Sequence, residues 1–244
     1  MYNETSFFQK GARRVRVTKK TKDEMIRILS EVYADAKPAL HFRNPFELLV
    51  AVILSAQCTD QRVNMVTKRL FAKAATPEAS VKMGLPRLEK EIHECGFFHA
   101  KAKNILATCE ILVRDYGGEV PEDFDALLGL PGVGRKTANV VTSIAFRRPA
   151  IAVDTHVFRV ANRLRLAVGE TPDEVELGLQ KAIPKEQWSD AHHWLIWHGR
   201  KVCKSRRPLC EECPLAKLCP SFGTDGVNEK KANGKKKASG GKKA

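Results

Sequence analysis

Residues 128–141 read LGLPGVGRKTANVV, and this stretch decides the expected fold. Apolar residues at helical spacing precede it, including Phe124 and Leu127, and another helical pattern follows it. Pro131 and the glycines between the two patterns predict a tight turn, because glycine tolerates positive φ and allows close approach of a ligand. Backbone N–H groups of such a turn and of the next helix start hold a phosphate. We therefore expect a helical hairpin that binds nucleic-acid backbone; an ordinary helix corner is the alternative. The expected binding residues are Gly132, Val133, Gly134 and Arg135.

Helical patterns also dominate the rest of the chain. Residues 46–56 are apolar on nearly every side, which predicts a helix buried at the centre of a bundle. Asn44 before Pro45, and Thr76 before the next proline, are typical of helix starts, whereas Gly96 and Gly117 are placed where helices end. No alternating stretch is long enough to indicate a sheet. The sequence therefore predicts an all-α fold.

Charge indicates the class of partner. The 244 residues carry 42 Lys and Arg against 28 Asp and Glu, a net charge of +14. Basic residues are dense in residues 10–22 and 223–244, but the rest of the chain is also basic. Such an excess favours a polyanion, because neutralised phosphates release counterions. Nucleic acid is preferred over an anionic membrane, since no basic amphipathic helix has a clean aromatic face. No apolar run approaches the roughly 18 residues of a membrane span.

Two residues are candidates for catalysis. Lys136 lies in the first turn of the second hairpin helix, where the helix dipole disfavours a positive charge, so its amine is a candidate nucleophile. A phosphate-pairing lysine is the alternative. Asp154 follows an apolar extended stretch and precedes a helix expected over residues 157–166. It is expected to cap that helix, and a carboxylate there is also suited to accept a proton or stabilise a cation.

Four of the seven cysteines fall within residues 203–219, with spacings of six, two and five residues. This grouping in a reducing interior predicts a metal site, either a four-iron, four-sulfur cluster or a tetrahedral zinc. The proposed ligands are Cys203, Cys210, Cys213 and Cys219. The other three cysteines, Cys58, Cys95 and Cys109, are expected to be buried on apolar helix faces. His192, His193 and His198 are interpreted as packing residues.

Several motifs together resemble one known family. These are LPGVGRKTANVV, VDTHVFRVANRL, LLVAVILSAQCTD, HHWLIWHGR and the cysteine spacing. Their order and separations are similar to those of the endonuclease III family of helix-hairpin-helix DNA glycosylases. The resemblance covers most of residues 38–222.

The resemblance implies two helical domains with the DNA groove between them. One is a six-helix barrel of residues 38–148 that contains the hairpin. The other combines residues 22–37 and 149–222 and carries one 4Fe-4S cluster. Residues 1–21 form a basic N-terminal extension and residues 223–244 a Lys-rich tail that we expect to be disordered; neither extension matches the family pattern.

The resemblance also implies roles for individual residues. Lys136 attacks the sugar C1′ of a flipped nucleotide, and Asp154 assists. Base release, a Schiff base and β-elimination follow. Gln57 corresponds to the residue that fills the vacated space, and Phe97 stands where relatives often have leucine as a second wedge; a core phenylalanine is the alternative for Phe97. Additional DNA contacts are expected from Thr155, His156, Lys204, Arg206 and Arg207.

The expected partner is double-stranded DNA with damaged bases or abasic sites, and the expected activity is removal of oxidised pyrimidines. We expect a monomer that does not bind membranes and acts in the cytoplasm at the nucleoid. One competing interpretation is an adenine-mismatch glycosylase, which usually lacks the hairpin lysine and has a further C-terminal domain. The other is a catalytically silent DNA-binding or redox module.

Overall fold

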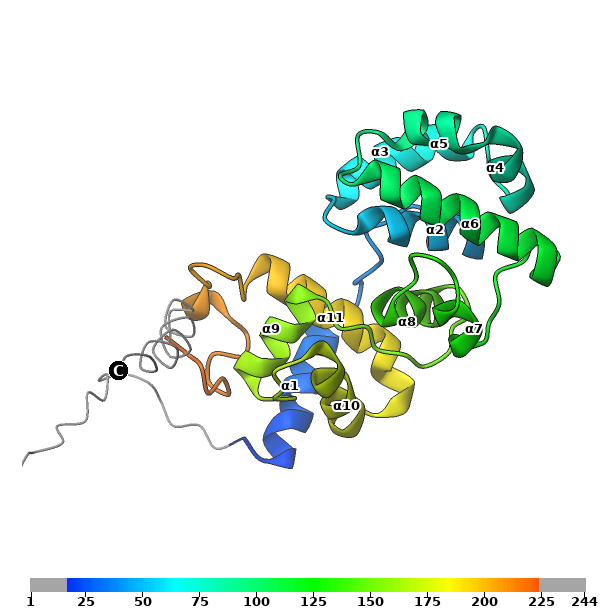
Figure 1. Cartoon of the computed structure of the whole chain (residues 1–244). Coiled ribbons are helices and arrows are strands. Elements are labelled where there is room, and N and C mark those ends of the chain that lie inside the picture. Colours follow the sequence, from blue (N-terminus) through cyan, green and yellow to red (C-terminus); the bar gives the residue numbers. More distant parts are fainter. Residues whose placement is uncertain (1–16, 224–244) are drawn as a thin grey trace, which may run out of the picture. The chain divides into compact units, whose positions relative to one another are not determined.

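The computed structural model describes residues 17–223, and all regular structure within this range is helical (Figure 1). The expected all-α fold is confirmed. The described residues form two compact units. The first, called the hairpin unit here, contains residues 37–152 and 185–189, and the second, called the cysteine unit, contains residues 17–36, 153–184 and 190–223. Most of the expected basic extension and of the expected disordered tail lies outside the described residues.

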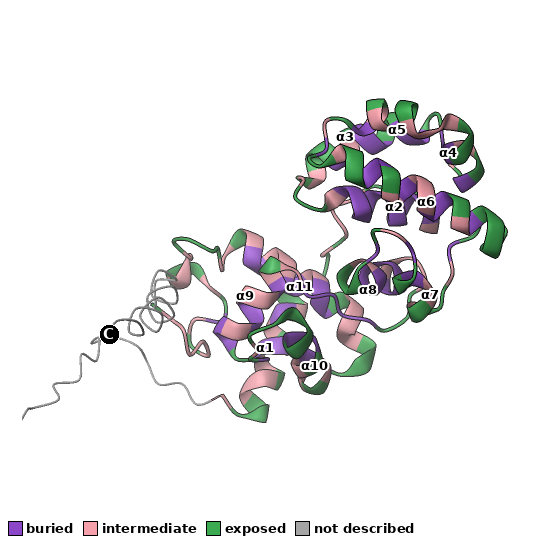
Figure 2. Ribbon diagram, viewed as in Figure 1, coloured by how far each residue is buried: buried purple, intermediate pink, exposed green. Residues whose placement is uncertain are grey.

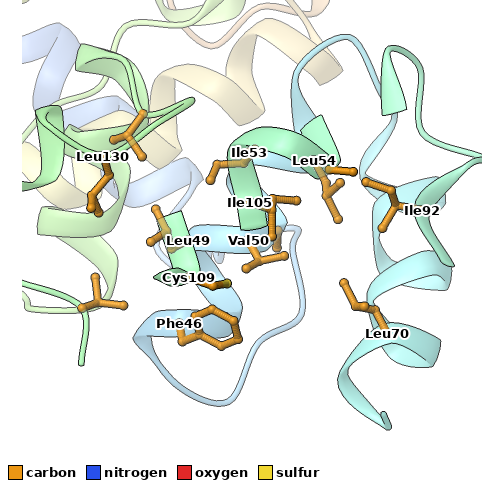
Figure 3. Packing of buried hydrophobic residues seen from close by; sticks show 14 of the residues in the cluster. Phe46, Leu49, Val50, Ile53, Leu54, Leu70, Ile92, Ile105, Cys109 and Leu130 are labelled. Atoms are coloured by element: carbon orange, nitrogen blue, oxygen red, sulfur yellow. The ribbon is translucent and has the colours of Figure 1, made fainter. Parts of the chain in front are cut away.

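The hairpin unit is built around one buried helix, α2 (Pro45–Ser55). Nine consecutive residues of α2, from Phe46 to Leu54, are buried (Figure 2). One face packs into a large apolar cluster (Figure 3), and a smaller cluster covers Leu48 and Val52 with Val140 and Ala152. The prediction of a central buried helix is confirmed. The surrounding helices are α3 (Asp60–Phe71), α4 (Pro77–Met83), α5 (Leu85–Ile92), α6 (Phe98–Tyr116), α7 (Phe124–Leu128) and α8 (Arg135–Ile144).

Local sequence signals explain where these helices begin and end. The Asn44 side chain accepts a hydrogen bond from the Glu47 N–H at 2.9 Å, and Pro45 occupies the first turn of α2. At the end of α6, Gly117 closes the helix in the left-handed conformation, with φ of 61°. Gly96 differs from its expected place, because α5 ends at Ile92 and Gly96 lies in the turn before α6.

The cysteine unit contains α1 (Lys19–Val32), α9 (Thr155–Leu164), α10 (Pro172–Ala182) and, from Asp190 onward, α11 (Trp188–Lys201), followed by the four-cysteine segment. The buried extended stretch before Asp154 is observed, and α9 begins two residues earlier than predicted because Asp154 caps it directly. The Lys22 ammonium attaches α1 to the segment after α9 by donating to the Leu166 carbonyl at 2.7 Å. Within residues 17–223, no helix has the length and apolar composition needed to cross a membrane.

Candidate active site and nucleic-acid interface

The predicted hairpin consists of α7, a glycine turn and α8. Gly132 has φ of 77°, in the left-handed region that glycine adopts without strain. The turn is fixed to α6, because the Thr108 hydroxyl donates to the Pro131 carbonyl at 2.9 Å. The Arg135 guanidinium lies 5.6 Å from the centre of the Phe124 ring and so connects the two helices of the hairpin. The turn is therefore attached to its surroundings on both sides.

Lys136 is the second residue of α8 and is exposed. Gly134 occupies the N-cap position and provides no side-chain hydrogen bond, so no side chain caps the amide groups at the start of α8. The first turn of α8 also carries no acidic residue. An anion at this helix start would meet backbone N–H groups and two cationic side chains, Arg135 and Lys136.

Gly132→Ala should destabilise the protein by about 1–3 kcal/mol, the usual cost of a non-glycine residue in a strained conformation. Besides the positive φ, a Cβ at this position would lie 2.9 Å from the Asn104 Cβ. The turn would have to shift, so binding to intact duplex DNA should weaken regardless of base sequence. Urea unfolding and fluorescence anisotropy with two unrelated duplexes measure the two effects.

Gly134→Ala is the matched control for stability. Gly134 has φ of −91°, and a Cβ there would have no neighbour within 4 Å. Its free energy of unfolding should change by less than about 1 kcal/mol, in line with the small preference for glycine over alanine at an N-cap. Equal destabilisation by both substitutions would show that the conformation of Gly132 is not the cause.

Asp154 is the N-cap of α9 and is half-buried. Its carboxylate accepts hydrogen bonds from the backbone N–H groups of His156 and Val157, both at 2.8 Å. The predicted capping role is confirmed. Both bonds end on the same oxygen, Oδ1, and within residues 17–223 Oδ2 accepts no hydrogen bond. One oxygen thus fixes the carboxylate while the other remains unoccupied for a substrate or a proton.

The two residues after Asp154 differ in exposure. Thr155 is exposed, whereas the His156 ring is half-buried and its Nδ1 accepts a hydrogen bond from the Arg159 guanidinium at 3.2 Å. Burial lowers the pKa of His156, and the Asp154 carboxylate opposes that change. A neutral imidazole at this position is suited to hydrogen bonding rather than to pairing with a phosphate charge.

Gln57 and Phe97 lie in two neighbouring loops of the hairpin unit. Both have left-handed backbones, with φ of 53° and 58°, although neither is glycine. A Cβ on Gly96 would lie 3.8 Å from the Gln57 carbonyl oxygen, so the loops approach each other closely. Phe97 is 70% exposed, so the alternative of a core phenylalanine is wrong. Exposed side chains on strained backbone are common at binding sites.

The four cysteines of residues 203–219 line one small cavity and none of them is in a disulfide. Burial raises the pKa of the Cys213 and Cys219 thiols to about 11, and the neighbouring thiols act in the same direction. The His198 ring is buried and lies 3.7 Å from the Cys213 sulfur through Nε2 and 3.1 Å from the Tyr33 hydroxyl through Nδ1. Burial lowers the pKa of His198 to about 4, which favours a neutral ring with one N–H.

The four thiols around one cavity are a ligand set for either a tetrahedral zinc ion or a 4Fe-4S cluster. Within the described part of the chain, no three His, Cys, Asp or Glu side chains converge closely enough to hold one metal ion. A tetrahedral zinc requires four sulfurs at about 2.3 Å from one centre. In a 4Fe-4S cluster each thiolate binds a different iron, so the sulfurs stand farther apart around a shared cavity. Cys203, Cys210, Cys213 and Cys219 supply the four thiols that a 4Fe-4S cluster requires.

Two arginines that the sequence did not single out attach α9 to the cysteine segment. The Arg163 guanidinium donates to the carbonyls of Lys204 and Ser205, at 2.7 and 3.2 Å, and to the Cys203 sulfur at 3.5 Å. Arg159 donates to the Cys203 carbonyl at 3.0 Å. The signal in the sequence was their separation of four residues, which puts both on one face of a helix.

The basic loop between the first two ligands is presented to solvent. Lys204, Arg206 and Arg207 are all exposed, while Arg163 holds the backbone of the loop in place. The loop is therefore a basic surface whose backbone is held by hydrogen bonds from α9. Its contact with DNA stays a prediction.

The remaining cysteine and histidine predictions have mixed outcomes. Cys95 and Cys109 are fully buried, as expected. His192 and His198 are buried and His193 is half-buried, and His198 also contacts Tyr33 and Cys213 through its ring nitrogens. Cys58 packs against the apolar cluster, but it is only half-buried and lies in the loop after α2, so its expected place on a helix face is wrong. Cys95 also lies in a turn, between α5 and α6. The left-handed residues Gln57 and Phe97 lie beside these cysteines, where the helical pattern is interrupted.

Comparisons with known proteins agree with this site. Residues 50–185 match the model of the HhH-GPD superfamily of base excision DNA repair proteins, and residues 203–219 match the iron-sulfur binding domain of endonuclease III. Endonuclease III of Rickettsia conorii is 52% identical, over 82% of this chain and 95% of that protein. Endonuclease III of Escherichia coli is 51% identical, over 74% and 85%. The structure of a trapped endonuclease III–DNA covalent intermediate aligns with a TM-score of 0.80 and 51% identity, over 84% of this chain and 96% of that one.

The fold and the site define a base-excision DNA repair enzyme of the helix-hairpin-helix class with an iron-sulfur domain. The alternatives of a catalytically silent module and of a zinc site are therefore wrong. Within the class, the chain belongs to the endonuclease III family. It is a DNA glycosylase and AP lyase that acts on duplex DNA and carries a 4Fe-4S cluster.

Proposed function

We propose that the chain removes oxidised pyrimidines from duplex DNA, with Lys136 as the nucleophile and Asp154 as the assisting carboxylate. The observation that carries the proposal is the exposed Lys136 amine, placed one residue after an uncapped, glycine-led helix start. The backbone amides of this start bind a phosphate of the damaged strand. The amine is thereby brought to the sugar next to that phosphate.

Lys136 attacks C1′ of the extruded nucleotide and displaces the base. The nitrogen passes one proton to Asp154, the ring oxygen O4′ takes up a proton as the sugar ring opens, and a protonated Schiff base joins the enzyme to the DNA. Removal of a proton from C2′ then expels the 3′ phosphate by β-elimination. An amine nucleophile explains why base removal and strand cleavage belong to one enzyme, whereas hydrolysis by water alone would stop at the abasic site.

Asp154 supports this chemistry with the oxygen that its capping role leaves unoccupied. The cap bonds to Oδ1 hold the carboxylate in one orientation. We assign Oδ2 the role of accepting a proton from Lys136 and of stabilising positive charge that develops on the sugar. A short, fixed carboxylate suits this role because it needs no reorganisation during the reaction.

A base inside the duplex is out of reach, so it must be extruded at a cost of about a few kcal/mol, lowest for damaged or poorly paired bases. The Gln57 amide is suited to fill the vacated space, since it can both donate to and accept from the orphaned base. The exposed Phe97 ring is suited to stack beside it. Both residues have the left-handed backbone conformation described above.

The cysteine segment holds the cluster through Cys203, Cys210, Cys213 and Cys219. When bound, the cluster supplies rigid cross-links between distant parts of this segment. We assign it a structural role: it keeps Lys204, Arg206 and Arg207 in position to contact phosphates. We assign Thr155 and His156 further contacts with the DNA backbone, and we place the protein, as a monomer, in the cytoplasm at the nucleoid.

Duplexes with a single oxidised pyrimidine, with or without borohydride, test the proposed function. The wild-type protein should cleave the damaged strand without alkali and should be trapped covalently when borohydride is added. An intact duplex should give neither product. Alkali-dependent cleavage confined to mismatched adenine would instead indicate the adenine-mismatch activity, and binding without any product would overturn the proposal.

A further inference from the structure

Lys101, in the first turns of α6, is a buried lysine that the proposed reaction does not use. Its residue is 6% exposed, and lysine is almost never buried without a partner. Its ammonium donates to two backbone carbonyls, those of Leu54 at 2.9 Å and Ala56 at 2.6 Å. No carboxylate of the described residues pairs with it. Burial lowers the pKa of Lys101, because the charged ammonium is less favourable away from water.

The two carbonyls belong to the end of α2. The last carbonyls of a helix lack intrahelical donors, and a cation there also interacts favourably with the helix dipole. α2 has no basic residue in its own last turn. Lys101 therefore supplies from α6 the donors and the charge that the sequence of α2 does not provide.

The residue that follows Ala56 is Gln57. A left-handed conformation costs a non-glycine residue roughly 1–2 kcal/mol, so the backbone on either side must be held to maintain it. The Lys101 ammonium holds two carbonyls shortly before Gln57, and the Gly96 turn, which leads to Phe97, approaches the Gln57 carbonyl. The same lysine follows Phe97 by one helical turn and bonds back to it, since its N–H donates to the Phe97 carbonyl at 3.1 Å.

We infer that Lys101 is a positioning residue, which presets the Gln57 and Phe97 loops in the conformation that enters the space left by the extruded base. The inference rests on the proposed roles of these two residues. Without the ammonium, the carbonyls of Leu54 and Ala56 lose this donor and the loop relaxes from its strained state. Ordering the loop would then be required during base extrusion, which slows that step.

A double-mutant cycle tests this inference. The variants are Lys101→Met, which keeps most of the length of the side chain but removes the donors, Gln57→Ala, and the two combined. Lys101→Met should lower the single-turnover excision rate on a duplex lesion by about tenfold or more. Because Lys101 acts partly through Gln57, the rate loss caused by Lys101→Met should be clearly smaller in the Gln57→Ala background than in the wild-type background. The affinity for undamaged duplex should change by less than about twofold, because the proposed effect is on base extrusion and not on the initial binding of DNA.

A spectroscopic readout separates positioning from simple stabilisation. A duplex with a stable abasic-site analogue opposite 2-aminopurine reports entry of a side chain beside the orphaned base through its emission. The wild-type protein should change this emission, and Lys101→Met should bind the duplex with a much smaller change. Lys103→Met, which removes an exposed charge from the same helix, should behave as wild type. Thermal unfolding verifies that each variant is folded.

The outcomes are distinct. Additive rate losses in the cycle, or a normal emission change with Lys101→Met, would overturn the positioning role. If Lys101→Met does not fold, Lys101→Arg, which retains donors, enters the same cycle and should restore the emission change at least in part; an absent change in a folded Arg variant counts against the inference. A wild-type protein that excises nothing would refute the proposed function instead.

Discussion

Lys136→Gln should abolish the borohydride-trapped adduct and lower cleavage of damaged duplex by about 10³-fold or more, the scale of losing a nucleophile. Glutamine has no basic amine, so it can neither attack C1′ nor form a Schiff base. Lys136 is exposed at the second position of α8, and its replacement removes no buried side chain. The variant should therefore remain folded, and its free energy of unfolding should be within about 0.5 kcal/mol of the wild-type value. Trapping and single-turnover cleavage measure the effect.

Arg135→Gln is the control for charge. It removes a cation from the same helix start but leaves the amine in place. This variant should bind damaged duplex more weakly, with a smaller salt dependence, and should still be trapped at saturating DNA. An undiminished adduct with Lys136→Gln would show that another residue is the nucleophile.

Asp154→Asn should lower the rate by about 10²–10⁴-fold, the usual contribution of a positioned acid or base, and leave stability nearly unchanged. The two effects separate because asparagine caps helices about as well as aspartate does. The amide oxygen can replace Oδ1 toward the His156 and Val157 N–H groups. The position of Oδ2 is then taken by an NH₂ group, which neither accepts a proton nor stabilises a cation.

Asp154→Ala completes the comparison. It removes the cap as well as the carboxylate. The variant should therefore show the same loss of rate as Asp154→Asn and, in addition, lose about 1 kcal/mol of stability. Chemical unfolding and single-turnover kinetics on both variants give the two quantities. If Asp154→Asn cleaved damaged DNA at the wild-type rate, the only role of Asp154 would be to cap α9.

The sequence predicted the elements whose signals are local. The cap at Asn44, the buried run of α2 and the αL glycine at Gly117 each depend on neighbours within one or two turns, and all are observed. The hairpin was predicted for the same reason, because glycine at a positive φ marks a turn without any knowledge of its surroundings.

Features that depend on distant residues were not predicted. Gln57 and Phe97 are not turn formers, and nothing in their own sequence predicts their left-handed backbones. Lys101 showed a faint signal, since it lies four residues before Ile105 on the buried face of α6. Arg163 likewise reads as an ordinary surface charge until its carbonyl partners in the cysteine segment are known.

The domain boundaries stay a prediction. The described residues separate into compact units near residues 37 and 153, close to the expected limits of 38 and 149. Assignment of residues 185–189 to the hairpin unit has no signal in the sequence, because a chain that returns to an earlier unit leaves no local mark.

The attachment of α9 to the cysteine segment has a consequence for oxidative stress. Arg159 and Arg163 bond to Cys203, Lys204 and Ser205, and Asp154 caps the start of the same helix. Oxidants that dismantle the iron-sulfur centre would loosen the backbone that these arginines hold, and the disturbance would run along a single rigid helix to the carboxylate. The orientation of the Asp154 carboxylate should therefore depend on an intact cysteine segment as well as on its own cap bonds.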